Sequence, residues 1–397
     1  MMWSKVLSLS VAALLAACGA DGPTTPNPID VGVAGDGGLD AVLDTLRRAM
    51  ALPALGAITI EGEQVVESGA VGFRASGESV GVTAGDLWHL GSLTKAMTAT
   101  LAAQFVEDGD VEWSTTIADA FPDLVGSIRP EFESVRLDEL LYHTGGLSNS
   151  INQTASWGAL RTSTDPLPEQ RREWVVELLS LTPAVARGTH YYSNAGYIVA
   201  GAMLEEISGQ PWETLMTDRI FTPLGMTSGG FGPPGQTGPG IEEPRGHVRQ
   251  GSSWVPLEPD VNADNPAALG PAGTVHATME DYARFVAEHL AGARGVGTLV
   301  TSDSYDKLHT PAPGTAYSLG WGVSTRAWAN GLTLAHAGSN TFWYAVVWVA
   351  PERNLAMIAV TNVGGQVAEQ ATDLAIQAML ERFENARTAS AAVMAGG

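Results

Sequence analysis

A serine and a lysine, Ser92 and Lys95, stand three positions apart at the start of an apolar pattern with helical spacing. Residues i and i+3 lie on the same face of a helix, one turn apart, so the hydroxyl and the amine can share a hydrogen bond. A serine is a weak nucleophile until a neighbouring base takes its proton. The spacing therefore predicts a nucleophile and its base at a helix N-terminus, where backbone N–H groups can stabilise an acyl oxyanion.

The alternative interpretation is that Ser92 caps the helix and that Lys95 is a solvated residue of its first turn. Composition argues against this alternative, because the chain has only three lysines beside eighteen arginines. The pKa of a lysine shifts readily on burial, whereas an arginine keeps its charge. A lysine at this position in a lysine-poor chain favours the catalytic interpretation.

Composition also bounds the class of protein. The chain has 397 residues, of which 45% are hydrophobic and 16% are charged, as is typical of a globular enzyme with a sizeable core. Its net charge of −22 argues against general affinity for nucleic acid or anionic membranes. A single cysteine excludes an internal disulfide, and the eight histidines show no H-E-x-x-H spacing. We expect no metal and no cofactor.

The N-terminus has the pattern of an exported lipoprotein. Residues 1–17 combine Lys5 with an apolar stretch and end in Leu-Ala-Ala, as a signal peptide does. The sole cysteine, Cys18, follows directly and resembles the lipidated cysteine of a bacterial lipobox; the alternative is an ordinary signal peptide with a chance cysteine. We expect lipidation at Cys18 and a flexible tether over residues 18–38, rich in Gly, Pro, Thr and Asp. The expected location is the bacterial cell envelope, periplasmic or outer membrane, with membrane contact through the N-terminal lipid only.

Periodicity places an α/β pattern at both ends of the mature chain and a helical, loop-rich stretch between them. We therefore predict an α/β (α+β) fold with an antiparallel sheet built from N- and C-terminal segments, flanked by helices, around an inserted, mostly helical domain. The α/β part covers about 39–110 and 265–386, the insertion about 111–264, and residues 387–397 form a tail. The predicted helices are 39–51, 92–108, 171–179, 195–208, 278–291 and 367–383, and the predicted strands are 55–61, 64–73, 319–326, 332–336, 343–349 and 355–361.

Three further patterns contain residues that could carry out chemistry. Gly77-Glu-Ser79-Val-Gly81 fits G-x-S-x-G, but no buried strand precedes it and no helix follows, so we interpret it as a chance match in a loop. His143 precedes a Gly-Gly turn, where a histidine more often holds the turn than acts as a base. Tyr192-Ser193-Asn194 taken alone favours a strand end and an Asn N-cap.

Three motifs occur in a fixed order: Ser92-x-x-Lys95, Tyr192-Ser193-Asn194 and His336-Ala337-Gly338. In this order and at these separations they resemble the serine β-lactamase and penicillin-binding-protein superfamily. The similarity is greatest to the class C β-lactamase-related group, which also contains esterases and D-amino-acid peptidases. It covers about 39–386 and implies a β-lactamase/transpeptidase-like fold. The stretches 140–147, 188–194, 223–226 and 320–322 also look similar.

The resemblance implies a role for each matching residue. Ser92 would form the acyl-enzyme, and Lys95 would help to deprotonate it. Tyr192 would be a second base, as a phenolate or a hydrogen-bond relay, and would later protonate the leaving group. Asn194 would orient Lys95 and the substrate amide. The backbone N–H groups of Ser92 and Ser339 would form the oxyanion hole, beside the substrate-binding residues His336 and Gly338.

The third motif departs from the pattern of true β-lactamases, which resembles Lys-Thr-Gly. A histidine is mostly neutral at pH 7 and is a poorer fixed cation for a β-lactam carboxylate than a lysine. The resemblance therefore implies a serine hydrolase that acts on small carboxylic esters or on D-amino-acid peptides and amides. The alternatives are a β-lactamase or D-Ala-D-Ala carboxypeptidase, or an inactive lipoprotein that only binds a ligand. The intact Ser92, Lys95, Tyr192 and Asn194 argue against an inactive protein.

Overall fold

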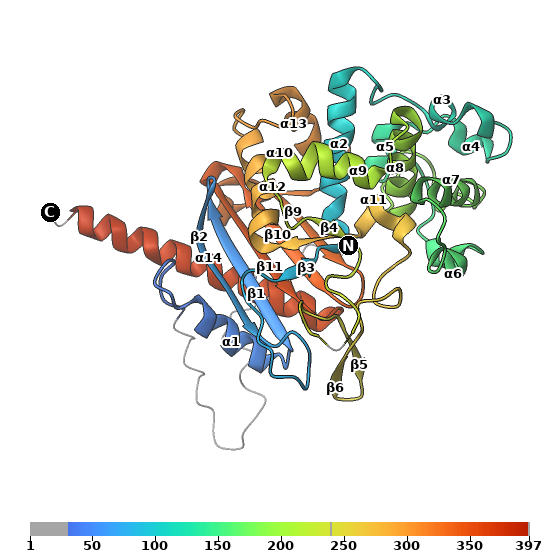
Figure 1. Ribbon diagram of the computed structural model, residues 1–397. Helices are drawn as coiled ribbons and strands as arrows, with labels where there is room; N and C mark the ends of the chain where they lie inside the picture. The colour runs from blue at the N-terminus through green and yellow to red at the C-terminus, as the bar shows by residue number, and fades with distance from the viewer. Residues whose placement is uncertain (1–30, 239, 396–397) are drawn as a thin grey trace.

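The computed structural model describes residues 31–238 and 240–395, and its main feature is a six-stranded antiparallel sheet (Figure 1). The strand order β2-β1-β11-β10-β9-β8 joins the N-terminal hairpin to the four C-terminal strands, as predicted. The hairpin joins the C-terminal strands where β1 pairs with β11, in a register that places Ile58 opposite Ile358. The strands are β1 (Ala54–Glu61), β2 (Gln64–Gly72), β8 (Gly322–Arg326), β9 (Gly331–Ser339), β10 (Tyr344–Ala350) and β11 (Leu355–Thr361).

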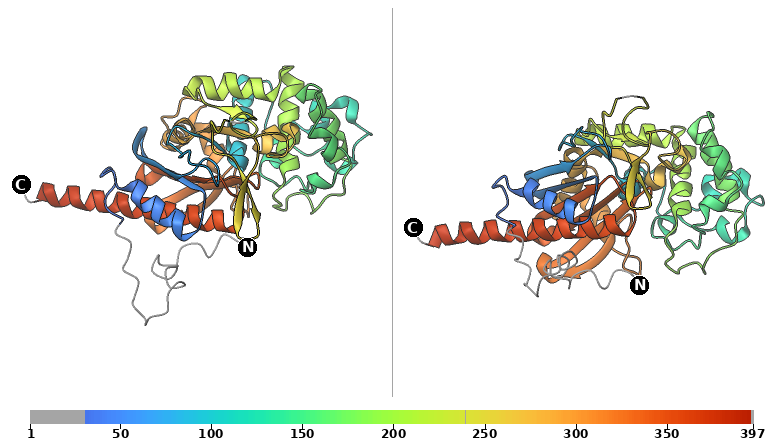
Figure 2. Two further views of the ribbon diagram at one scale, coloured as in Figure 1. Left: turned by 60° about the horizontal axis from the view of Figure 1, so that its bottom comes forward. Right: turned by 90° about the horizontal axis from the view of Figure 1, so that it is seen from below.

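Both faces of this sheet are covered. Side chains alternate between the faces of a strand, so Leu55 and Ala57 of β1 pack in one core and Ile58 and Ile60 in another. The first core is closed by helices α1 (Leu39–Ala49) and α14 (Gln366–Ala395), which lie side by side on that face (Figure 2). The second core includes α2 (Thr94–Asp108) and α12 (Met279–Gly292).

A mostly helical region lies beside the sheet, and its residues fall in sequence between the two sheet-forming parts (Figure 1). The division of the chain into an α/β part and an inserted domain, with its boundaries, stays a prediction. Within the helical region, the fully buried Arg171 joins three elements through Glu213 at 2.6 Å, through Glu205, and through the Ala268 carbonyl at 3.0 Å. The remaining helices are α3 (Ile117–Ala120), α4 (Pro130–Glu133), α5 (Leu137–Leu141), α6 (Trp157–Leu160), α7 (Leu167–Leu178), α8 (Asn194–Ser208), α9 (Trp212–Met216), α10 (Thr222–Leu224), α11 (Gly270–Gly273) and α13 (Ser302–His309).

Two small sheets were not predicted. One has the order β3-β7-β4 and the other is the hairpin β5-β6. Their strands have two to four residues each, too few to show an alternating pattern. They are β3 (Leu87–His89), β4 (Gly230–Phe231), β5 (His247–Gln250), β6 (Ser253–Pro256) and β7 (Val275–Thr278).

The two ends of the described chain also differ from the sequence prediction. Helix α14 continues to Ala395 instead of ending at Phe383, because no glycine or proline interrupts it before Gly396. At the N-terminal end, Val31 and Val33 lie within the predicted tether, but their carbonyl oxygens accept hydrogen bonds from the buried Arg382 of α14. These bonds tie the N-terminal segment to this helix. The predicted signal peptide and Cys18 lie outside the described residues. Within the described part, no helix is long and apolar enough to cross a bilayer.

Candidate active site

Ser92 lies in a tight 3-10 turn, Gly91–Leu93, that leads directly into α2. The turn depends on Gly91, whose φ of +52° lies in the left-handed region. A Cβ on Gly91 would come within 2.4 Å of the backbone nitrogen of Ser339, so this contact with β9 also excludes a side chain. Ser92 is therefore half-buried where the start of α2 meets the C-terminal end of β9.

Lys95 sits on the first turn of α2 and is fully buried. Its Nζ lies 3.0 Å from the Ser92 hydroxyl, 2.7 Å from Asn194 Oδ1 and 2.5 Å from the Ala272 carbonyl oxygen. Burial lowers the pKa of the amine well below its usual 10.5. The two carbonyl oxygens can only accept hydrogen bonds, so they take both N–H groups of a neutral amine. The lone pair of that amine then faces Ser92.

The second motif approaches Lys95 from the start of α8. Asn194 is the first residue of α8, and Lys95 Nζ lies 5.0 Å from the centre of the Tyr192 ring. Burial raises the pKa of the Tyr192 phenol, and a hydrogen bond with Ser92 only partly opposes this rise. The phenol is therefore neutral at pH 7 and can donate a hydrogen bond.

The third motif lies at the end of β9, and its histidine is 5% exposed. His336 Nδ1 lies 2.8 Å from the Ala337 carbonyl oxygen, so this nitrogen carries the proton. Its Nε2 then accepts a hydrogen bond from the Tyr317 hydroxyl at 2.9 Å. Burial is the main cause that lowers the pKa of His336, to about 3. At pH 7 this histidine is neutral, and both ring nitrogens are already hydrogen-bonded within the protein.

Gly338 brings β9 against the Ser92 turn. A Cβ at this position would lie 2.0 Å from the Leu90 carbonyl oxygen and 2.8 Å from the Ser92 nitrogen. With a glycine there, the backbone nitrogens of Ser92 and Ser339 come to the same junction, as the predicted oxyanion hole requires. The proton of the Ser339 hydroxyl is not available at this junction, because it is donated to the Trp343 carbonyl oxygen at 2.6 Å.

One loop holds the second motif in place, and sequence reasoning found it only in part. His143 Nδ1 accepts the N–H of Ser193 at 3.2 Å, and its ring packs against Tyr192 at 4.4 Å between centroids. This geometry agrees with the interpretation of His143 as a residue that holds the turn. Asn149 Oδ1 accepts the N–H of Asn194 at 2.8 Å. Asn149 was missed, and the only signal for it was its place just after the Thr-Gly-Gly turn.

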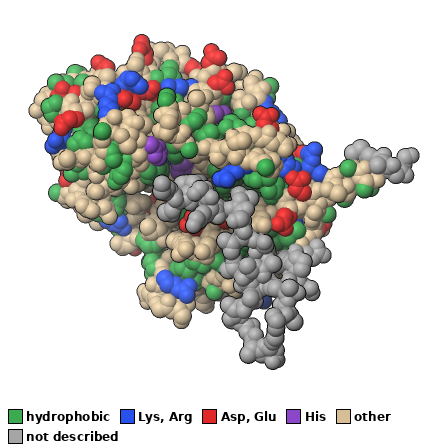
Figure 3. Space-filling view, turned by 180° about the vertical axis from the view of Figure 1, so that it is seen from behind, with side chains coloured by type: hydrophobic (Ala, Val, Ile, Leu, Met, Phe, Trp, Pro, Cys, Tyr) green, Lys and Arg blue, Asp and Glu red, His purple; other side chains and the backbone are tan. Residues whose placement is uncertain are grey.

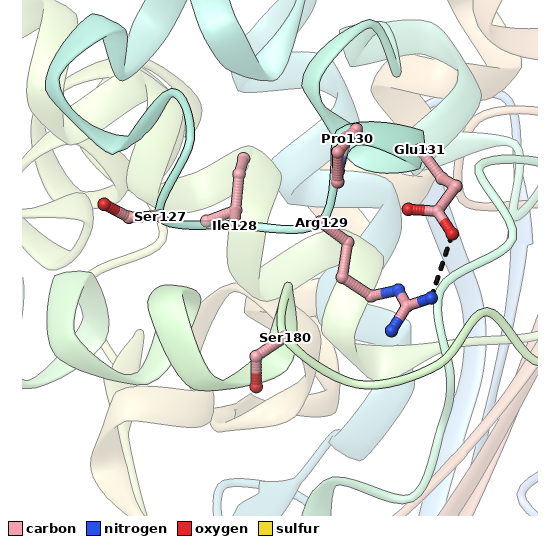
Figure 4. Close-up of a pocket in the computed structure, with 6 residues that line it drawn as sticks. All are labelled: Ser127, Ile128, Arg129, Pro130, Glu131 and Ser180. Carbon is pink, nitrogen blue, oxygen red and sulfur yellow. Dashed lines mark hydrogen bonds and ion pairs between the residues drawn. The ribbon is translucent and has the colours of Figure 1, made fainter.

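Two other features lie outside this constellation. Ser79 of the G-x-S-x-G match is exposed in a loop, as expected of a chance match. A surface pocket lined by residues 127–131 and Ser180 contains an Arg129–Glu131 ion pair at 2.9 Å and none of the predicted site residues (Figure 4). On the face shown in Figure 3, basic side chains are interspersed with acidic and apolar ones and form no continuous patch.

Comparisons with known proteins identify relatives of several kinds. A protein-family model described as Beta-lactamase matches residues 39–380. Penicillin-binding protein 4 of Amycolatopsis lactamdurans is 26% identical over 77% of this chain and 79% of its own. Lovastatin esterase of Penicillium rubens is 28% identical over 40% of this chain and 43% of its own. The D-amino acid amidase of Ochrobactrum anthropi, solved with L-phenylalanine amide, has a TM-score of 0.68 and 21% identity, over 89% of this chain and 98% of its own. At that identity, the structural match shows a shared fold alone.

The contact of Gly338 with the Ser92 turn can be tested by substitution. We expect Gly338→Ala to lower the free energy of unfolding by about 1–3 kcal/mol, because the added methyl group meets backbone atoms that cannot rotate away. Gly331→Ala on the same strand is the matched control, since its methyl group would meet only the flexible side chain of Glu352. Urea denaturation measures both variants. Equal stability of the two would contradict the close approach.

Proposed function

The chain belongs to the beta-lactamase family, which makes it a serine hydrolase, and we propose that Ser92, Lys95 and Tyr192 carry its reaction through an acyl-enzyme. The observation that carries this proposal is the environment of the Lys95 amine. It is buried and lies 3.0 Å from the Ser92 hydroxyl, and two fixed carbonyl oxygens occupy its other positions. A lysine in this environment acts as a neutral base toward the serine.

In the proposed acylation step, Ser92 Oγ attacks the substrate carbonyl carbon while its proton passes to Lys95 Nζ. The carbonyl π electrons move to the oxygen, where the backbone N–H groups of Ser92 and Ser339 stabilise the negative charge. Collapse of this intermediate breaks the bond to the leaving group, which takes a proton through the Tyr192 hydroxyl. Water then attacks the acyl-enzyme by the same steps in reverse order and releases the acid.

Tyr192 works in this scheme as a relay and not as a phenolate. Its pKa is raised by burial, so the phenolate is scarce at neutral pH. Its hydrogen bond with Ser92 and its place beside Lys95 Nζ allow a proton to pass between the amine and the leaving group. Asn194 keeps the amine in position through its Oδ1.

The preferred substrates are small carboxylic esters and D-amino-acid amides. Support comes from the third motif, where His336 is neutral and both of its ring nitrogens are engaged. In the described part of the chain, no arginine is a hydrogen-bond partner of the predicted site residues. Penicillins and D-Ala-D-Ala peptides carry a carboxylate close to the scissile bond, and such a site offers it no fixed cation. Relatives named as an esterase and a D-amino acid amidase fit this preference.

The substrate class and the nucleophile can be tested together. Initial rates of the purified protein are measured on p-nitrophenyl butyrate, a D-alanyl anilide and nitrocefin, with Ser92→Ala as the control. We expect ester turnover to exceed nitrocefin turnover, and Ser92→Ala to lose about a thousandfold or more in kcat with its fold intact. Full activity in Ser92→Ala would overturn the serine mechanism. Dominant nitrocefin turnover would instead move the protein to the β-lactamase alternative.

The protonation state of Lys95 predicts a pH profile. The folded pKa is lowered, so the neutral base is present above that pKa and activity is lost as the pH falls through it. We expect kcat/KM to reach its plateau well below pH 10.5, where an ordinary lysine loses its proton. Lys95→Arg should lose about 100- to 10,000-fold in kcat, because a guanidinium keeps its proton. A value of kcat/KM that still rises tenfold per pH unit as the pH approaches 10.5 would contradict a lowered pKa of the amine.

We also propose that the protein is exported and anchored by a lipid on Cys18. The support is the sequence pattern, in which the sole cysteine directly follows Leu15-Ala16-Ala17. Expressed in a bacterium, the native chain should incorporate radiolabelled palmitate and sediment with membranes. Cys18→Ser should lose the label and the sedimentation, with activity per molecule unchanged. Label retained by Cys18→Ser would refute the anchor.

A further inference from the structure

A buried histidine, His89, is hydrogen-bonded to the turn that carries Ser92. His89, at the end of β3, is 1% exposed, and its Nδ1 accepts the backbone N–H of Gly91 at 3.1 Å. This bond requires an unprotonated Nδ1, so the ring proton is on Nε2. Nε2 then donates to Asp264 Oδ2 at 2.8 Å. Through this imidazole, Asp264 is linked to the Leu90–Gly91 peptide, which directly precedes the peptide that carries the Ser92 N–H.

The same carboxylate also reaches the other side of the junction. Asp264 Oδ1 accepts a hydrogen bond from Asn340 Nδ2 at 3.0 Å, and both residues are buried. Asn340 Oδ1 in turn accepts the backbone N–H groups of Phe342 and Trp343 at 3.1 Å each. These bonds hold the corner that follows Ser339, in which Thr341 has a φ of +81°, a strained value for a β-branched residue.

We propose that Asp264 is a positioning residue for the oxyanion hole, a role that rests on the proposed function. Through His89 it fixes the turn with the Ser92 N–H, and through Asn340 it fixes the corner after Ser339. The two N–H groups come from segments nearly 250 positions apart, so their convergence needs a shared support. The stacking of His89 on Trp343, at 5.7 Å and 25° between the rings, ties the same two segments together.

A carboxylate suits this place because its three hydrogen-bond partners within the described chain all donate. His89 Nε2–H donates to Oδ2, and Asn340 Nδ2 and the backbone N–H of Asn265 (2.7 Å) donate to Oδ1, so each oxygen must be an acceptor. In Asp264→Asn one oxygen becomes an NH₂ group, so one of the two links becomes a contact between donors. The substitution keeps the size of the side chain and breaks the bridge on one side.

The direct test is the steady-state kinetics of Asp264→Asn on p-nitrophenyl butyrate. We expect kcat to fall about 10- to 100-fold, because a small displacement of an oxyanion donor costs rate, with KM within about threefold of its original value. The matched control is the same chemical change at the exposed Asp110, which should leave kcat unchanged. The melting temperature of each variant reports whether the fold is intact.

Two further variants separate positioning from stability. His89→Asn keeps an acceptor for the Gly91 N–H but loses the donor to Asp264, so it should lose at least about tenfold in kcat. The exchange D264N/N340D restores a donor and an acceptor between the two positions and leaves an oxygen for His89. It should recover at least tenfold over N340D, which places two carboxylates in contact. Recovery is partial because the bond from Asn340 to the Ala263 carbonyl is lost and the Asn265 N–H loses its acceptor.

The outcomes are decisive even if Asp264→Asn does not fold, because His89→Asn and the exchange variant then carry the test. Wild-type kcat in Asp264→Asn or in His89→Asn would overturn the proposal, and so would an exchange variant that regains stability without regaining kcat. Failure of the proposed function is distinguishable, since it would appear as activity in Ser92→Ala. An inactive Ser92→Ala beside a fully active Asp264→Asn rejects the positioning role alone.

Discussion

The structure of the site depends on the burial of one amine that has no acidic partner among the described residues. Lys95 is fully enclosed, and its neighbours are a hydroxyl, an amide oxygen and a backbone carbonyl oxygen. A charged ammonium in such a place pays a large desolvation cost, which lowers its pKa. Because carbonyl oxygens only accept hydrogen bonds, they also orient the neutral amine. Three separate parts of the chain must therefore meet at Lys95: α2, the start of α8 and the carbonyl of Ala272.

Glycines permit the backbone of these parts to meet closely. Gly338 and Gly91 let β9 contact the Ser92 turn at distances that leave no room for a Cβ. Gly320 does the same on another side, where a Cβ would lie 2.4 Å from Cα of Ala96 on α2. Backbone N–H groups around the site donate hydrogen bonds to buried side chains, among them those of His89, His143 and Asn340. The histidines of this region thus act mainly as hydrogen-bonding groups.

The net charge of the chain does not determine the protonation of the side chains at the site. The protein carries a net charge of −22, yet burial lowers the pKa of Lys95 and of His336 and raises the pKa of Tyr192, and so favours the neutral form of each. A proton can pass from the Ser92 hydroxyl to a neutral Lys95 amine without a charged side chain at the site beforehand. The buried carboxylate of Asp264 is directed at His89 and Asn340.

The sequence by itself determined the local features. The i, i+3 spacing of Ser92 and Lys95, the alternation in the strands and the helical spacing of α1, α2, α8 and α12 follow from backbone geometry, and each was predicted. The resemblance of the three motifs added the family and the expected roles. Short strands such as β3 and β7 carried too few residues for a pattern.

Only the tertiary structure decided the rest. The contact of Ala272 with Lys95 and the links from Asp264 to His89 and Asn340 join residues 177, 175 and 76 positions apart. A hydrogen bond at such a separation leaves no periodic trace, because it depends on how whole elements pack. The same is true of protonation: the sequence names a lysine and a histidine, but burial in the folded chain sets their pKa values.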